Sequence, residues 1–373
     1  MQIEEHAAKY AAQPMFLYMP FQAVHGPLDS SPHWQSMFNK ADFDGNEDRF
    51  TMAAMVVEMD FAVGKVVDAF KDNNAMYNNT VFILSADNGG LHTAGGYNYP
   101  LRGEKNTLWE GGVKAVGFVH SALLPPSVVG KVYSGLVHVS DWFPTLLQLA
   151  AAGATGGGLV REGEGGVKAA REDGLDGFDV WMAITTNGTS PRTELLHNID
   201  ILADSATGSR GFGNAAIRMG SYKLIVGNAV GGRGELNVTH FVAPGCNATR
   251  CPALTPSSDT ITDSNHTVNI NRKSNVDGRH YSLRAAAAAA GGKCAGDTNT
   301  TDTWLFNIAA DPYELCNLAK SLPEQVERMV ERLAFYNRTA VPPLNANITD
   351  DPAADPASRT GSFTPKGCWG PWR

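Results

Sequence analysis

One short stretch constrains the fold of this chain more than any other. Residues 80–84, Thr-Val-Phe-Ile-Leu, form an apolar run of β-branched and aromatic side chains with turn residues on both sides. This composition predicts a fully buried strand of a parallel α/β sheet. Ligands bind such sheets just beyond the carboxyl ends of the strands. Asp87 and Asn88 follow shortly after the run, so the sequence predicts a binding site around them.

A metal ion is one ligand that these two side chains favour. Asp87 supplies a carboxylate and Asn88 a carboxamide, which are hard oxygen donors suited to Ca²⁺ or Mg²⁺. Gly89 and Gly90 allow the backbone to turn sharply and to come close to a ligand. An Asp-Asn-Gly-Gly segment is also common in plain surface turns, so both interpretations are open from these residues alone.

The order of the predicted elements gives an α/β unit in the first part of the chain. An apolar run at 15–19 predicts a strand, and residues 48–72 have the apolar stripe of an amphipathic helix. With the strand at 80–85 these elements predict a βαβ unit and a parallel strand pair. The loop at 91–112 is too long for a simple connector, and such loops often carry function.

The second part of the chain has a different pattern. Short strands are predicted at 215–219, 222–226 and 304–308, and a helix at 323–336. This order predicts a small antiparallel sheet covered by one helix. We therefore expect two domains, 1–205 and 206–373, with an insertion at 228–301 whose polar, Gly/Asn/Thr-rich composition predicts disorder.

Charge and sequence motifs restrict the partners and the compartment. The net charge of −8 at pH 7 argues against non-specific binding to nucleic acid or to anionic membranes. No apolar run reaches the length of a membrane span. Eight N-x-S/T sequons indicate a glycosylated protein of the secretory route. The absence of a signal peptide and the odd count of five cysteines lead us to expect that an N-terminal portion is missing, although Met1 could be the true start.

Many ordered runs together resemble the sulfatase family, and within it the arylsulfatase B-like (N-acetylgalactosamine-4-sulfatase) branch. The matching runs are 16–18, 22–25, 79–83, 87–90, 94–96, 100–103, 108–113, 140–142, 176–181, 194–200, 304–306, 311–312 and 369–372. The resemblance covers 14–226 and 302–373. It implies an alkaline-phosphatase-like sulfatase fold of the α/β class, with an incomplete, mostly parallel sheet flanked by helices and a smaller C-terminal α+β domain.

The resemblance also implies an activity. Such enzymes are Ca²⁺-dependent sulfuric ester hydrolases, and this branch acts on sulfated carbohydrate or aryl sulfate. Their nucleophile is a formylglycine that a formylglycine-generating enzyme makes from the Cys of a C-x-P-x-R motif. A secreted or lysosomal location follows from the same resemblance and from the sequons.

Four residues of this sequence match functional positions of the family. Asp87 and Asn88 match two ligands of the metal. Lys105 matches a lysine that contacts the sulfate, where an ammonium group stabilises developing negative charge. His25 matches a histidine that contacts the sulfate and assists departure of the alcohol oxygen. We expect the other histidines, His92 included, to be structural, and Arg102 to be an ion-pair partner that orders its loop.

The sequence departs from the family at the nucleophile. The C-x-P-x-R motif, an Asp pair and a Lys-x-His element belong N-terminal to His25, and none of them occurs in this chain. Cys246 begins a C-x-A-x-R run, but it follows Asp87 and overlaps a sequon, so we expect it to form a disulfide instead. We therefore predict that this chain alone is inactive. It is either part of an active sulfatase or a non-catalytic relative that binds sulfated glycans; a phosphohydrolase of the same superfamily is a further alternative.

Overall fold

The computed structural model describes residues 2–43, 45–154, 175–200, 213–227 and 302–341. In chain order its elements are α1 (Gln2–Lys9), α2 (Pro32–Gln35), η1 (Lys40–Phe43), α3 (Glu47–Lys71), α4 (Asn74–Tyr77), β1 (Val81–Ser85), η2 (His92–Ala94), α5 (Glu110–Val113), β2 (Gly117–Ser121), η3 (Val139–Asp141), α6 (Trp142–Ala154), α8 (Trp181–Thr186), β3 (Glu194–Ile199), β4 (Ala215–Met219), β5 (Tyr222–Val226), β6 (Thr303–Asn307) and α10 (Pro323–Arg338). The insertion expected at 228–301, with Cys246, lies outside the described residues.

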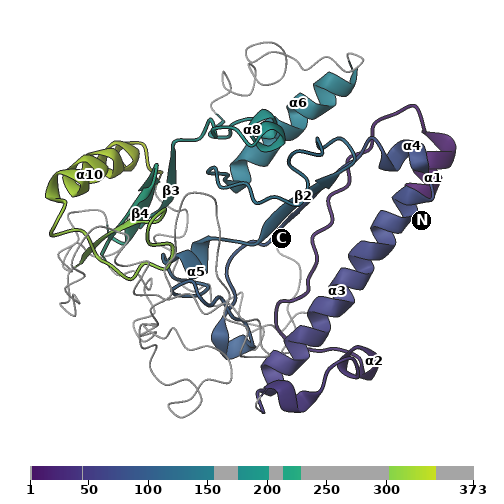
Figure 1. The fold of residues 1–373 in the computed structure, drawn as a ribbon, viewed down its shortest axis with the longest axis horizontal. Coiled ribbons are helices and arrows are strands. Elements are labelled where there is room, and N and C mark those ends of the chain that lie inside the picture. The colour runs from purple at the N-terminus through teal and green to yellow at the C-terminus, as the bar shows by residue number, and fades with distance from the viewer. Residues whose placement is uncertain (1, 44, 155–174, 201–212, 228–301, 342–373) are drawn as a thin grey trace, which may run out of the picture.

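The long helix α3 and the C-terminal sheet lie on opposite sides of the molecule. Figure 1 shows α3 along one side and β4 with α10 on the other, with β2 and α5 between them. None of the helices in the described ranges is long and apolar enough to cross a membrane.

Helix α3 forms where the sequence predicts it. Its first turn is capped by Asn46, whose side chain accepts a hydrogen bond from the backbone N–H of Arg49 at 2.9 Å. Its other end packs into a small core, in which Phe70 meets the ring of Phe82 on β1 with 5.3 Å between the ring centroids. The helix therefore supports one face of β1, the strand that leads into the Asp87 turn.

Strand β1 pairs with β2 in an antiparallel ladder that runs from Val81 opposite Ser121 to Ser85 opposite Gly117. The parallel pairing expected between 15–19 and 80–85 is not found in the part of the chain that the structure describes. Residues 15–19 are not assigned to a strand. Two alternate side chains of this segment, Met15 and Leu17, pack against the α3–β1 core. Strand β1 is half-buried along its apolar residues, not fully buried as predicted.

The second sheet has the strand order β3-β4-β5-β6, and every pairing in it is antiparallel. The predicted hairpin is present, with Gly220 between β4 and β5 at a positive φ of 56°. Helix α10 covers one face and closes a core of fully buried side chains with Ile217, Leu224, Leu305 and Met329. The predicted small antiparallel sheet under one helix is thus confirmed, and β3 is its first strand.

Candidate functional site

The Asp87 turn leaves β1 at the end of its ladder with β2. Asp87 is exposed, and its Oδ1 accepts a hydrogen bond from the backbone N–H of Asn88 at 2.9 Å. The amide Nδ2 of Asn88 donates to the carbonyl of Gly89 at 2.9 Å. Among the described residues, no donor is bonded to Asp87 Oδ2 or Asn88 Oδ1, so both oxygens are available to a cation or water.

Gly89 and Gly90 serve close packing of two backbones. A Cβ atom at Gly89 would lie 1.7 Å from the carbonyl oxygen of Gly111, and one at Gly90 would lie 2.9 Å from the Cα of Gly96. The N–H of Gly89 also donates to the carbonyl of Gly112 at 3.0 Å. Glycine is therefore required here by the neighbouring loop, in addition to the sharp turn that the sequence predicts.

Asn98 fastens the long loop 91–112 to this turn. Its Oδ1 accepts from the N–H of Gly90 at 2.8 Å, and its Nδ2 donates to the carbonyls of Gly90 at 2.8 Å and Gly103 at 3.3 Å. The N–H of Lys105 adds a further bond to the Gly90 carbonyl at 3.2 Å. Sequence reasoning missed Asn98, because a polar residue in a loop has no periodic pattern that marks a partner.

The structure brings together two of the four predicted site residues. Lys105 Nζ lies 3.3 Å from His25 Nε2, although the residues are 80 positions apart in the chain. The other ring nitrogen of His25, Nδ1, lies 2.9 Å from the carbonyl oxygen of Gly26, which can only accept. Nδ1 is therefore assigned the proton, and Nε2 accepts from the Lys105 ammonium group. The pair is open to solvent and presents positive charge.

Asp87 and Asn88 are linked to Lys105 through the backbone, because the N–H of Lys105 donates to the carbonyl of Gly90, two residues after Asn88. The four predicted residues thus belong to one loop assembly, with the oxygen donors on the turn after β1, Lys105 on the loop 91–112 and His25 on a separate loop that meets the Lys105 side chain.

A buried group of charges supports this loop assembly from the C-terminal sheet. Lys223 on β5 is fully buried, and its Nζ lies 2.9 Å from Glu110 Oε1 and 2.9 Å from Glu314 Oε1. Burial acts to raise the pKa of Glu110, but the charge and hydrogen bond of Lys223 outweigh it, so the pKa of Glu110 is lowered. Burial raises the pKa of Glu314 despite the same lysine. Glu110 precedes the two glycines on which the Asp87 turn rests.

Arg102 orders its loop as predicted, but through different partners. Its guanidinium lies over the ring of Trp109 at 3.6 Å, and its Nη1 donates to the backbone carbonyl of Glu314 at 3.1 Å. Burial lowers the pKa of Arg102, and Glu314 opposes that effect. Cation–π stacking and a carbonyl bond therefore replace the expected ion pair.

The oxygen donors of the Asp87 turn are of the type that a hard divalent cation binds, but they are too few to complete its coordination. Asp87 and Asn88 offer two oxygens, whereas Ca²⁺ takes 6–8. The described residues contain no group of three or more His, Cys, Asp or Glu side chains that could hold a metal ion. These two residues can therefore supply part of a metal site.

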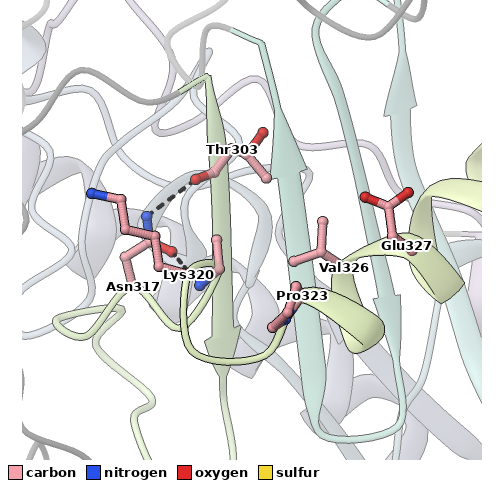
Figure 2. Close-up of a pocket in the computed structure, with 7 residues that line it drawn as sticks. Thr303, Asn317, Lys320, Pro323, Val326 and Glu327 are labelled. Carbon is pink, nitrogen blue, oxygen red and sulfur yellow. Dashed lines mark hydrogen bonds between the residues drawn. The ribbon is translucent and has the colours of Figure 1, made fainter.

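The cavity in Figure 2 lies elsewhere, between β6 and the start of α10. It has a volume of about 210 Å³, and Thr303, Asn317 and Pro323 are among the residues that line it. Asn317 Nδ2 donates to the carbonyl of Thr303 at 3.1 Å. The cavity contains none of the predicted site residues, so we do not assign the candidate site to it.

Comparison with known proteins relates the chain to one family. Residues 2–152 match the family described as Sulfatase. The chain is 35% identical over 373 residues to Arylsulfatase J of Mus musculus, an alignment that covers 96% of this chain and 50% of the relative. It is also 33% identical over 151 residues to a Sulfatase of Formosa agariphila, which covers 38% of this chain and 27% of that protein. The chain thus spans about half the length, or less, of these curated relatives.

Solved structures agree on the fold. The crystal structure of Ps i-CgsB has a TM-score of 0.55 and 23% identity, and the match covers 90% of this chain and 54% of that one. The PsFucS1 sulfatase from Pseudoalteromonas sp. has a TM-score of 0.55 and 18% identity, with 91% and 50% covered. The predicted alkaline-phosphatase-like sulfatase fold is confirmed, as a mixed α/β structure whose described sheets are antiparallel.

Proposed function

We propose that this chain, which belongs to the sulfatase family and whose residues 2–152 match it, forms part of a sulfuric ester hydrolase. The substrate class that we propose is sulfated carbohydrate, with aryl sulfates as small analogues, as in the arylsulfatase B-like branch. The arylsulfatase relative and the series of matching runs support this proposal. A secreted or lysosomal location is part of it, supported by the eight sequons.

The observation that carries the proposal is the contact between His25 and Lys105. A sulfate ester bears one negative charge, and an anion placed between two cationic donors is stabilised by both. Lys105 would bind a sulfate oxygen through its ammonium group. When Lys105 binds the sulfate, its hydrogen bond to His25 Nε2, present in the free protein, would break. His25 Nε2 would then be available to the substrate.

His25 is then placed to move a proton. When the imidazole is protonated, Nδ1 keeps its bond to the Gly26 carbonyl and Nε2 becomes a donor. That donor can protonate the alcohol oxygen as the sulfate leaves it. The sulfate charge between the two residues offsets the repulsion between imidazolium and ammonium.

Asp87 and Asn88 would supply two of the oxygen ligands of a Ca²⁺ ion, which stabilises the sulfate oxygens when bound. The formylglycine that the family uses has no source in this sequence, because no Cys here begins a C-x-P-x-R motif. We propose that the nucleophile is a formylglycine that a formylglycine-generating enzyme makes from a cysteine not contained in this sequence. The remaining metal ligands are likewise proposed to be residues that this sequence does not contain.

Two alternatives follow from the missing nucleophile. A non-catalytic relative would bind sulfated glycans through His25 and Lys105 without hydrolysis. A phosphohydrolase of the same superfamily would use a Ser or Thr nucleophile at the position of the formylglycine. The matching arylsulfatase runs favour the sulfatase.

The proposal is tested by binding and by hydrolysis. Isothermal titration of this chain with 4-nitrophenyl sulfate measures anion binding, and we expect Lys105→Ala to weaken it about tenfold, the value of one charge-assisted bond. Lys131→Ala is the matched control, since Lys131 is an exposed lysine outside the site. Equal affinity in all three proteins would exclude the proposed anion site. Hydrolysis of the same compound by a longer protein that carries a C-x-P-x-R motif, and its loss in Asp87→Ala, tests the enzyme itself.

A further inference from the structure

We propose that His92, held in place by the buried Glu104, binds a second anionic group of the substrate next to the sulfate that is removed. The inference deepens the proposed function and rests on it. His92 was expected to be structural, and no matching run of the family contains it.

Glu104 is a buried residue whose carboxylate is hydrogen-bonded to His92. Its side chain is only 2% exposed. Its Oε2 accepts from the backbone N–H of His92 at 2.8 Å and lies 2.5 Å from the Nδ1 of the same residue. Its Oε1 is buried and has no hydrogen-bond partner in the described part of the chain. Because a carboxylate oxygen faces Nδ1, this ring nitrogen is assigned a proton and donates it to Glu104.

The His92 ring is fixed at one end and open at the other. Two bonds to a single carboxylate oxygen, one from the backbone and one from Nδ1, restrain the ring at its own turn. The side chain is nevertheless 57% exposed, so the face away from Glu104 meets solvent. With Nδ1 engaged, the ring in its protonated form offers its Nε2–H to an outside acceptor. A restrained cationic donor of this kind suits an anionic ligand, because little side-chain entropy is lost on binding.

The position of His92 connects it to the proposed site. His92 lies two residues after Gly90, and two residues span at most about 7 Å. Gly90 in turn accepts the backbone bond of Lys105, which is the neighbour of Glu104 in the chain. His92 and Lys105 therefore rise from adjacent parts of one loop assembly.

The first turn of α3 brings further charged residues to this loop. The loop after η2 packs against that turn, since a Cβ at Gly95 would lie 2.6 Å from the carbonyl oxygen of Asp48. Arg49 is occupied there by the ring of Tyr97, at 4.4 Å from its centroid. Glu104 is thus the only carboxylate that the described contacts place directly on the His92 ring.

The test compares ligands with one and with two anionic groups. Isothermal titration of this chain with 4-nitrophenyl sulfate and with a disulfated chondroitin disaccharide gives two dissociation constants for each variant. We expect His92→Gln to weaken binding of the disulfated ligand about tenfold, as for one charge-assisted bond, and to leave the monosulfated ligand unchanged. Lys105→Ala should weaken both ligands. His33→Gln, at an exposed histidine of α2, is the matched control and should change neither.

Each other outcome is decisive. If His92→Gln affects both ligands equally or neither of them, the inference about His92 is wrong while the proposed function stands on the Lys105 result. If Lys105→Ala affects neither ligand, the proposed function itself fails. Proton–nitrogen NMR of the imidazoles gives a second measurement on the unmutated chain: the disulfated ligand should shift His92 Nε2 and the monosulfated ligand should not. Equal shifts with both ligands, or none, would also overturn the inference.

Discussion

Lys223 Nζ lies 2.9 Å from Glu110 Oε1, and the two residues are 113 positions apart in the chain. Both side chains are buried, so the bond joins the C-terminal sheet to the loop that supports the Asp87 turn. Gly111 and Gly112, which follow Glu110, provide the backbone surface on which Gly89 rests. The position of the candidate metal ligands therefore depends on a strand from the other end of the sequence.

Replacing Lys223 with Met should destabilise the fold strongly. The change leaves the carboxylates of Glu110 and Glu314 buried without their shared cation, and breaking a buried pair from one side costs about 3–5 kcal/mol. The free energy of unfolding in urea measures it. Lys131→Met removes an exposed lysine and is the control, for which we expect a change within about 0.5 kcal/mol. A similar small effect for Lys223→Met would show that the buried charges are compensated elsewhere.

Replacing Gly89 with Ala should displace the Asp87 turn. The added Cβ would stand 1.7 Å from the Gly111 carbonyl oxygen, a backbone atom that cannot move aside without its loop. We expect a loss of about 3 kcal/mol, at the upper end of ordinary overpacking costs. Gly64→Ala is the matched control, because nothing lies within 4 Å of that site inside α3 and alanine should stabilise the helix by about 0.5–1 kcal/mol. Equal stability of the two variants would contradict the close packing.

Replacing Asn98 with Ala should loosen the attachment of Lys105 to the turn. The change removes the acceptor of the Gly90 N–H and a donor to two carbonyls. We expect the free energy of unfolding to fall by about 1–3 kcal/mol, the cost of leaving such groups unsatisfied. Hydrogen exchange at the Gly90 and Lys105 amides should quicken. The control is Asn79→Ala, at an exposed asparagine, and unchanged exchange at Gly90 in Asn98→Ala would refute the role of Asn98.

We expect the free energy of unfolding to decrease in mild acid because of His197. The ring stands at a β-bulge between Leu196 and Asn198, and its Nε2 is buried without a hydrogen-bond partner among the described residues. Burial lowers the pKa of His197 well below its ordinary value of 6.5, and the charge of Lys223 adds to the effect. Below pH 6.5 the unfolded chain therefore binds a proton that the folded chain does not, so stability is present above pH 6.5 and is lost as the pH falls below it.

Urea unfolding at pH 7.5 and pH 5.5 measures this dependence. One such group lowers the free energy of unfolding by up to about 1.4 kcal/mol between these values, and His197→Asn should remove that part of the difference. His33→Gln, at an exposed ring, should leave the difference as it is in the parent chain. A dependence on pH that is the same in His197→Asn as in the parent would exclude His197 as its source.

Local patterns were sufficient for several elements. The apolar stripe at 48–72 predicts α3, and the structure places it at Glu47–Lys71. The hairpin around Gly220 and the helix beginning at Pro323 are likewise found where predicted. Each of these depends on neighbours within a few positions, so the sequence pattern contains the information. The parallel pairing of 15–19 depends on a partner strand, and no local pattern specifies which strand that is.

The partners of polar side chains were beyond the reach of such patterns. Asn98, Glu104 and Lys223 are ordinary residues in the sequence, yet each is central to the loop assembly in the structure. Their importance comes from burial and from a partner elsewhere in the chain. A lysine on a predicted strand is usually exposed, and only packing against Glu110 and Glu314 makes Lys223 a fully buried charge beside the site.

The sequence by itself determined the chemical groups of this protein. It supplied oxygen donors after a strand, a histidine and a lysine in loops, and a series of runs shared with sulfatases. Tertiary structure decided which groups meet: His25 and Lys105 stand 80 positions apart and come within 3.3 Å, and Asn98, Gly90 and the buried Lys223 hold the Lys105 loop in place. The physical reason is that residue type fixes what a group can donate or accept, whereas distance and burial depend on the packing of the whole chain.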